Sequence, residues 1–272
     1  MTEPHFRLEP VAEGAWAAIA LPDRGAVGNA GLVDLGGRTL VFDTFFTPAA
    51  ARDLLAAARE LGLPPVEVVV NSHWHGDHVR GNQVFEDAAI VATRATCELV
   101  ATRGQESLAG LRQQLESAED VPDELVEAVA EIEQRLPDDL FDERRDLGRA
   151  ELVTYGGGHT ASDAFLHLPA ERVLFAADLV VVHSHPWMGH GDPDQWPRIL
   201  ERMRELDVDV LVPGHGPVGG RDDVDAMLGY LDEAVTAARE HGASAPVPER
   251  YRDWDFADGW ARNLDFLAGR AA

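Results

Sequence analysis

The chain has 272 residues, of which 45% are hydrophobic and 26% are charged, and its formal net charge is −25. This length suits a large α/β domain with an insertion, and we expect residues 1–272 to form a single domain. All 23 basic residues are arginine. So acidic a surface serves general solubility, and it repels phosphate backbones and anionic membranes, which excludes nucleic acid and membranes as expected partners.

Three further absences narrow the class of protein. No stretch of about 18 apolar residues predicts a transmembrane helix. Residues 1–10 lack the basic and apolar regions of a signal peptide, so the cytoplasm is the expected location. The single cysteine, Cys97, cannot form an intrachain disulfide and is expected to be a buried structural thiol. The composition leaves open whether the chain is a monomer or a homodimer.

The N-terminal part alternates strand and helix signals. Short apolar runs bounded by Gly, Pro and Asp predict strands at residues 14–20, 30–35 and 40–42. Pro48 opens an Ala- and Leu-rich helix that we expect to run from Ala49 to Leu61. The β-branched run Val66–Val70 is typical of a strand that is buried on both faces.

Residues 95–147 differ from what precedes them. They are acidic, poor in β-branched residues and helical in period, which predicts two or three helices inserted into the fold. This insertion either caps a substrate cleft and sets specificity, or serves as a dimerisation or structural arm. Strand signals then return at 152–155, 164–168, 173–176 and 208–212. Helices are expected over about 221–272, and their apolar residues Trp254, Trp260, Leu264 and Leu267 are expected to dock on the core.

One stretch carries most of the chemistry. Three histidines and an aspartate lie within the six residues His73-Trp74-His75-Gly76-Asp77-His78, directly after the predicted buried strand. Imidazole and carboxylate are preferred ligands of zinc, and they also suit iron and manganese. Because the adjacent Asp77 and His78 cannot easily point the same way, such a loop can serve two neighbouring ions. The alternative, a surface histidine cluster, is disfavoured because three further features agree.

These three features each end or follow an apolar run. His159 follows the glycine run Gly156–Gly158, which permits a tight turn. Asp178 follows residues 173–177, where a carboxylate either caps the next segment or binds a ligand. His215 follows residues 208–212. Each signal is weak alone, but open α/β sheets commonly bind ligands at the carboxyl ends of their strands.

In this order, the H-x-H-x-D-H motif and the Gly-His-Thr, Asp and Pro-Gly-His-Gly segments resemble the metallo-β-lactamase superfamily, from the first strands to His215. The resemblance implies a four-layer αββα sandwich, that is, an α/β fold with two mixed sheets. It also implies two zinc ions, with iron or manganese as alternatives. One ion would be held by His73, His75 and His159, the other by Asp77, His78 and His215, with Asp178 bridging both.

The implied activity is hydrolysis of a small ester, lactone, thioester or amide, β-lactams included, by a hydroxide shared between the two metals. Asp77 would orient this nucleophile and handle a proton. The residues expected to orient the ligand imidazoles are Asp43, at the end of strand 40–42, and then Thr160 and Asp163. Asn71 and Ser72 fit equally well as ordinary turn formers.

A second polar segment follows Asp178. Trp187, together with one of His183, His185 and His190, is expected to line the substrate pocket, and the alternative is an exposed loop with incidental histidines. All three histidines lie within eight residues of one another.

Other functions are compatible with the same fold. A mononuclear iron enzyme similar to the persulfide dioxygenases would use only the first set of ligands, so the complete second set argues against it. A β-lactamase usually carries an export signal, and glyoxalase II binds glutathione through basic residues of its C-terminal helices, where this chain has only arginines. A nuclease is disfavoured by the charge, and a binding module without activity is disfavoured because all seven ligand positions are filled.

Overall fold

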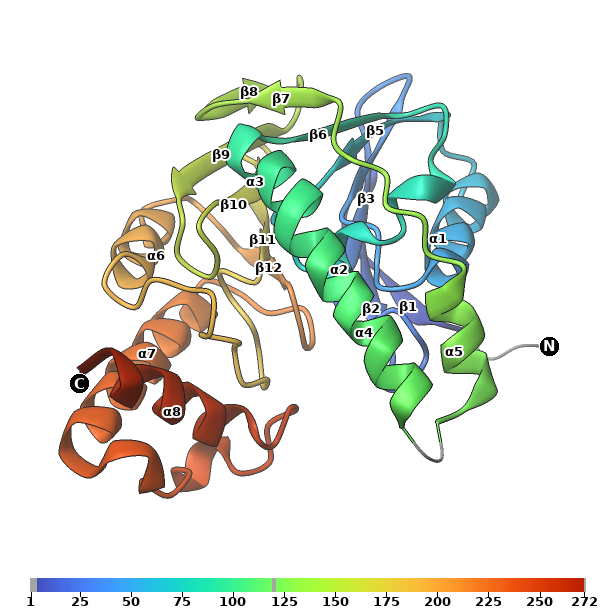
Figure 1. Cartoon of the computed structure of the whole chain (residues 1–272). Helices are drawn as coiled ribbons and strands as arrows, with labels where there is room; N and C mark the ends of the chain where they lie inside the picture. Colours follow the sequence, from blue (N-terminus) through green and yellow to red (C-terminus); the bar gives the residue numbers. More distant parts are fainter. Residues whose placement is uncertain (1–3, 119–120, 272) are drawn as a thin grey trace.

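Two mixed β-sheets face each other between layers of helices in the computed structural model of the chain, which describes residues 4–118 and 121–271 (Figure 1). Residues 119–120 of the expected insertion, and residues 1–3 and 272 of the expected domain, lie outside the described residues. The arrangement is the four-layer αββα sandwich that the family resemblance implied.

The first sheet contains seven strands in chain order. Its first four strands are antiparallel, whereas β4 to β7 run parallel. Helix α1 (Pro48–Glu60) connects β4 to β5 and buries Ala51 and Leu54 against the outer face. The strands are β1 (Phe6–Ala12), β2 (Ala15–Ala20), β3 (Ala30–Asp34), β4 (Thr39–Phe42), β5 (Val66–Val70), β6 (Ala89–Thr93) and β7 (Asp139–Phe141).

The second sheet has the order β12-β11-β10-β9-β8. Only β11 and β12 are parallel, and helix α6 (Trp196–Arg204) connects them. Helices α7 (Asp222–His241) and α8 (Gly259–Ala271) pack with α6 on its outer face, where Trp260, Leu264 and Leu267 are buried as expected (Figure 1). The strands are β8 (Arg144–Asp146), β9 (Glu151–Gly156), β10 (Asp163–Leu168), β11 (Val173–Ala177) and β12 (Val210–Pro213).

The core between the sheets explains the β-branched run of β5. Val68 and Val70 face the second sheet, while Val69 faces the helix side, so both faces of the strand are covered as the sequence predicted. The sheets approach closely at Gly31, because a Cβ atom there would lie 2.3 Å from the Phe175 ring. Glycine at this position therefore lets the two sheets meet.

The region expected to be helical differs from the expectation in its last part. It contains α3 (Arg94–Leu99), a π-helical turn (Val100–Gly104), α4 (Gln105–Ser117) and α5 (Asp123–Ala130), and then the strands β7 and β8. These strands have three residues each, too few to show a period of two. They add one edge strand to each sheet. Strands β1 and β6 and helix α6 were not predicted.

No helix among the described residues is both long and apolar enough to cross a bilayer.

Candidate metal centre

The residues with metal-binding chemistry gather where strands end. The motif loop follows β5, and its second half forms the short helix α2 (Gly76–Val79). His159 lies in the loop between β9 and β10, Asp178 directly follows β11, and His215 follows β12. The fold therefore brings together side chains that are up to 142 positions apart, counting from His73 to His215.

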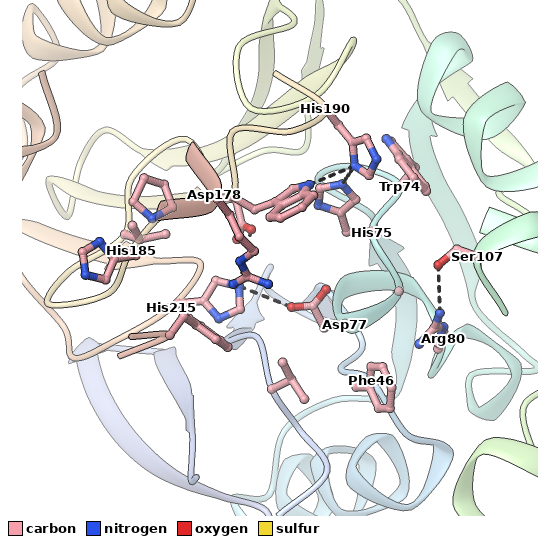
Figure 2. A pocket seen from close by; sticks show the side chains of 17 residues that line it. Phe46, Trp74, His75, Asp77, Arg80, Ser107, Asp178, His185, His190 and His215 are labelled. Carbon is pink, nitrogen blue, oxygen red and sulfur yellow. Dashed lines mark hydrogen bonds and ion pairs between the residues drawn. The ribbon is translucent and has the colours of Figure 1, made fainter. Parts of the chain in front are cut away.

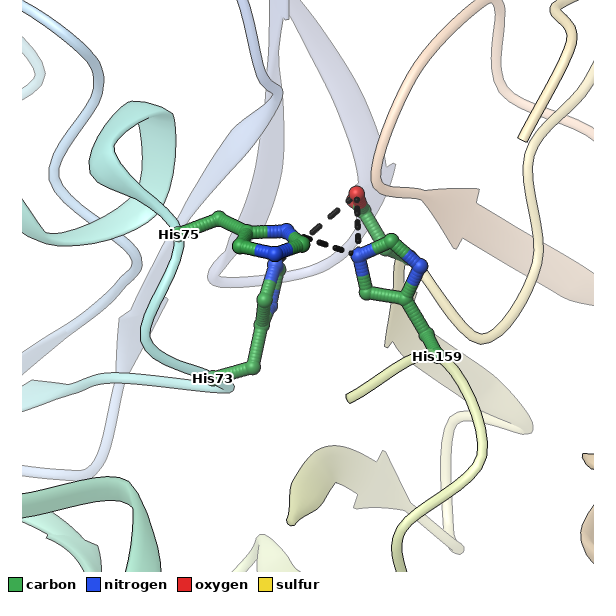
Figure 3. A group of neighbouring side chains, drawn as sticks. His73, His75 and His159 are labelled. Carbon is green, nitrogen blue, oxygen red and sulfur yellow. Dashed lines mark hydrogen bonds and ion pairs between the residues drawn. The ribbon is translucent and has the colours of Figure 1, made fainter. Parts of the chain in front are cut away.

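The first group consists of His73, His75, His159 and Asp178, whose ligand atoms all lie within 4.8 Å of one another (Figure 3). His159 Nε2 lies 2.9 Å from His75 Nδ1 and 3.2 Å from Asp178 Oδ2. His73 Nε2 lies 3.8 Å from the same carboxylate oxygen. Nitrogen and oxygen ligands converging in this way are typical of a site for a divalent cation.

The second group consists of Asp77, His78 and His215. Asp77 Oδ2 lies 3.5 Å from His78 Nε2 and 3.3 Å from His215 Nε2. Asp178 reaches this group as well, because its Oδ1 lies 3.1 Å from His78 Nε2 and its Oδ2 lies 3.4 Å from His215 Nε2. The carboxylate of Asp178 thus lies between the two groups, at the position that the family resemblance assigns to a bridging ligand, and the bridging itself stays a prediction.

Buried atoms without partners show that these residues fit metal ions. The Nε2 atoms of His73 and His78 and the Oδ1 atom of Asp178 are buried, and within the described residues they have no hydrogen-bond partner of suitable geometry. Leaving buried polar atoms unpaired costs free energy, so each such atom needs an explanation. A cation coordinated by these atoms would explain why they have no hydrogen-bond partner.

A chain of hydrogen bonds fixes the orientation of His73. Ser72 Oγ lies 2.7 Å from Asp43 Oδ2 and 2.9 Å from His73 Nδ1. An ionised carboxylate only accepts, so the Ser72 hydroxyl donates its single hydrogen to Asp43 and accepts from His73 Nδ1–H. This leaves the lone pair of His73 on Nε2, the atom that faces Asp178.

Asp43 holds a second imidazole in the same way. His78 Nδ1 lies 2.8 Å from Asp43 Oδ2, so the proton on Nδ1 leaves the lone pair on Nε2, toward Asp77. Burial raises the pKa of Asp43, and His78 and Ser72 oppose that rise. One buried carboxylate thus bonds the second group directly, at His78, and the first group through Ser72, the arrangement expected of a residue that orients ligands. Ser72, which fitted a turn former in the sequence, belongs to this chain of bonds.

The two groups differ in their electrostatics. Burial lowers the pKa of His73 well below its usual range and that of His159 to about 4, so both imidazoles are neutral at pH 7. Burial acts on His215 too, but the carboxylates of Asp178 and Asp77 outweigh it and raise the pKa of His215 to about 10. The second group therefore concentrates negative charge where a cation is to be held.

Thr160 and Asp163 were expected to orient an imidazole, and the structure places them differently. Asp163 accepts hydrogen bonds from the backbone N–H groups of Gly158 and Thr160 and from the Thr160 hydroxyl. Burial raises the pKa of Asp163 to about 7. In the part of the chain that is described, neither residue bonds a ligand imidazole. They fix the loop that carries His159 rather than its ring.

The segment after Asp178 does reach the site. Trp187 Nε1 donates to His190 Nδ1 at 3.2 Å, and His75 Nε2 lies 2.8 Å from the same atom. Because an indole nitrogen can only donate, His190 Nδ1 is an acceptor, and His75 Nε2 must carry the donated hydrogen. The lone pair of His75 is then on Nδ1, the atom that faces His159.

A cavity of about 340 Å³ opens over these groups (Figure 2). Trp187, His185 and His190 all line it, whereas His183 does not. His185 is buried, and its ring nitrogens lie 2.8 Å from the Tyr230 hydroxyl and 3.1 Å from the Tyr251 carbonyl, so it also ties the cavity wall to the C-terminal part of the chain.

Two residues at the site carried no signal in the sequence. Arg80 lines the cavity beside Asp77 (Figure 2). Asn29 is buried, and its Nδ2 donates to the carbonyls of Pro213 and Gly216, on either side of the His215 loop. A single Arg or Asn between ordinary residues is not distinctive, and only the fold shows what these two contact.

Comparison with known proteins identifies the family. Residues 23–215 match the model of the metallo-beta-lactamase superfamily. The chain belongs to this superfamily. The match covers more than half of the chain and includes both groups of His and Asp residues, which together imply a metal site in this protein.

Individual relatives are distant. The chain is 26% identical over 229 residues to a linear primary-alkylsulfatase of Pseudomonas sp. (strain ATCC 19151), covering 72% of this chain and 43% of that protein. It is 27% identical over 175 residues to a beta-lactamase-like protein 2 homolog of Caenorhabditis elegans, covering 62% and 47%. The chain thus spans less than half the length of these two relatives. The crystal structure of the DIM-1 metallo-beta-lactamase superposes with a TM-score of 0.67 at 21% identity, covering 85% of this chain and 99% of that one, which shows the shared fold.

Proposed function

We propose that this chain is a dinuclear metal-dependent hydrolase of a small ester, lactone, thioester or amide. The observation that carries the proposal is the pair of His and Asp groups joined by the Asp178 carboxylate at the floor of a cavity. Two zinc ions fit these ligand types, with iron or manganese as alternatives. The first ion would be held by His73, His75, His159 and Asp178, and the second by Asp77, His78, His215 and Asp178.

The bound ions would supply a water of lowered pKa and polarise the bond to be cleaved. The protein's own contribution is position and proton handling. The side chain of Asp77 is 19% exposed and lines the cavity, so it can accept a hydrogen bond from an attacking water and orient that water toward the substrate. The same carboxylate can pass the proton on to the leaving group.

The cavity wall supports a small-molecule substrate. Aromatic rings of Trp74, Trp187 and Phe256 line it, as expected of a pocket for a partly apolar small molecule. Ser107 of α4 also lines it, which supports a role of the helical region in shaping the substrate site. The relatives named as an alkylsulfatase and a beta-lactamase-like protein give reason to test sulfate esters and β-lactams beside simple esters.

Elemental analysis of the freshly purified protein tests the proposal, combined with hydrolysis assays on a 4-nitrophenyl ester, an alkyl sulfate, a lactone, a thioester and nitrocefin. We expect about two zinc ions per chain, and hydrolysis that is lost with a chelator and restored by zinc. His73→Ala should reduce both the metal content and the activity. A single iron per chain, with oxygen consumed in place of hydrolysis, would contradict this function and favour a persulfide dioxygenase-like enzyme.

A further inference from the structure

One arginine in the cavity wall, Arg80, forms no ion pair with an acidic residue in the described part of the chain. Arg80 is only 7% exposed. Within the described residues its side chain makes a single hydrogen bond, from Nη2 to Ser107 Oγ at 3.3 Å, and no carboxylate lies within ion-pair distance of the guanidinium. A buried charge is normally paired, because an uncompensated one is costly. The described residues therefore supply an acceptor for only part of the N–H donors of this guanidinium.

The surroundings of Arg80 leave its nitrogen atoms available to the cavity. Arg80, Ser107 and Phe46 all line the cavity, and Figure 2 shows them on the same side of it. The Phe46 ring covers the guanidinium from 4.6 Å. A Cβ atom on Gly76 would lie 2.4 Å from Cζ of Arg80, so the guanidinium packs directly against Gly76, and a larger residue there would displace it. Of its five N–H donors, most remain for a ligand.

Arg80 also stands next to the centre of the proposed reaction. It lies three residues after Asp77 at the end of α2, and residues at this spacing share one face of a helix. Asp77 is one of the second group of metal-binding residues. A substrate group bound by Arg80 would thus lie beside the bond that Asp77 and the metals are proposed to attack.

The charges of the cavity favour an anion. Its lining contains two carboxylates, Asp77 and Asp178, and two guanidiniums, Arg80 and Arg262. The Arg262 side chain is 44% exposed and pairs with Asp258 at 3.0 Å, so Arg80 is the one of the two guanidiniums to which the described residues offer no carboxylate. These four charges cancel, and the two divalent cations of the proposed function would make the cavity positive inside a chain of net charge −25.

We propose that Arg80 binds an oxyanion of the substrate, a carboxylate or a sulfate, and that the enzyme acts on anionic esters or amides with an apolar body. The planar guanidinium matches either oxyanion through two parallel hydrogen bonds. The inference rests on the proposed hydrolase function, since the cations and the reacting bond belong to it. Arg80 is a specificity-determining residue in this view.

Two esters that differ in one charged group test the proposal. The zinc-loaded enzyme is assayed with mono(4-nitrophenyl) succinate, which carries a carboxylate, and with 4-nitrophenyl butyrate, which does not. We expect Arg80→Gln to lower kcat/KM for the succinate ester roughly ten-fold or more, the usual effect of losing a hydrogen bond to a charged group, and to change the butyrate value less than about two-fold. Arg80→Lys should retain part of the preference. Arg239→Gln removes the same charge from an exposed position on α7 and should change neither.

A binding measurement separates this inference from the proposed function. Hexanoate and hexyl sulfate are titrated by calorimetry into the zinc-loaded wild type, Arg80→Gln and Arg239→Gln proteins. Weaker binding of one or both ions to Arg80→Gln alone supports the oxyanion site and tells carboxylate from sulfate, even if neither ester is hydrolysed. Equal affinities in all three proteins, or no binding to the wild type, would overturn it. If Arg80→Gln changes kcat/KM equally for both esters, the proposed hydrolase function stands and the role of Arg80 is rejected.

Discussion

The N-terminal and C-terminal halves of the molecule contribute to the metal centre in opposite ways. The N-terminal half supplies four residues from the single stretch 73–78, directly after β5. The C-terminal half supplies one residue from each of three separate loops, at His159, Asp178 and His215. The first set is a local motif, whereas the second exists only because neighbouring strands end at the same edge of a sheet.

The supports of the two halves differ as well. The motif loop is held from within its own sheet, because Asp43 follows β4, the parallel neighbour of β5, and bonds Ser72 and His78. The loop of His215 is held from the other sheet, by Asn29. The ligand positions in the motif loop therefore depend on one neighbouring side chain, Asp43. The position of His215 depends on how the two sheets contact each other.

Asp43→Asn should have the largest effect. The bonds that orient the imidazoles, from Ser72 Oγ and His78 Nδ1, both reach Oδ2, while Oδ1 accepts from the Ser72 backbone N–H. An asparagine amide has a single oxygen, so in either orientation its NH2 group faces a donor, and the support of both imidazoles is weakened. We expect zinc affinity to fall by roughly 10–100-fold, as for other residues that orient metal ligands. Competition with a chromophoric chelator measures it. Thr39→Val is the control, since it removes a partly buried hydrogen bond to the Pro64 carbonyl, far from the site. If both variants bind zinc like the wild type, Asp43 does not orient the ligands.

Asn29→Ala breaks the support of the other half. Its Nδ2 donates to the Pro213 and Gly216 carbonyls at 2.9 Å each. Leaving buried acceptors unpaired costs about 1–3 kcal/mol, which urea unfolding of the metal-loaded protein would measure. Elemental analysis should show that the second ion is lost more readily than the first. Equal loss of both ions would mean that the two halves are not held independently.

His190→Phe tests the contact between the halves, and its effect should be the smallest. It removes the acceptor of His75 Nε2 at an exposed position, so we expect zinc affinity to fall by about ten-fold, the lower end of the range for such partners. His190→Asn should restore most of it, because its amide oxygen can accept in place of Nδ1. The absorption spectrum of the cobalt-substituted protein reports the ligand geometry directly. A spectrum and affinity unchanged in His190→Phe would reject the role of this hydrogen bond.

Whether the role of a residue could be predicted from the sequence depends on how far along the chain its contact partners lie. The buried strand β5 was predictable because its β-branched run needs no knowledge of partners, whereas β7 and β8 are too short for any period to show. Asp43 was found because a carboxylate that ends an apolar strand is unusual. Arg80 and Asn29 were missed because their partners lie 27 and 184 positions away. The seven expected ligand residues do lie in two adjoining groups, and their binding of metal stays a prediction.

The bond from Asn29 to the loop of His215 spans 184 positions of the sequence, and this separation has a consequence for biosynthesis. Chains fold from the N-terminus while they are made, so the stretch 73–78 emerges long before His159, Asp178 and His215. A cation captured at that stage would have only part of its final ligands and would exchange freely. The second group cannot close until at least 215 of the 272 residues exist. A complete set of ligands for the proposed second ion is therefore present only late in synthesis or after it, when the loop of His215 docks.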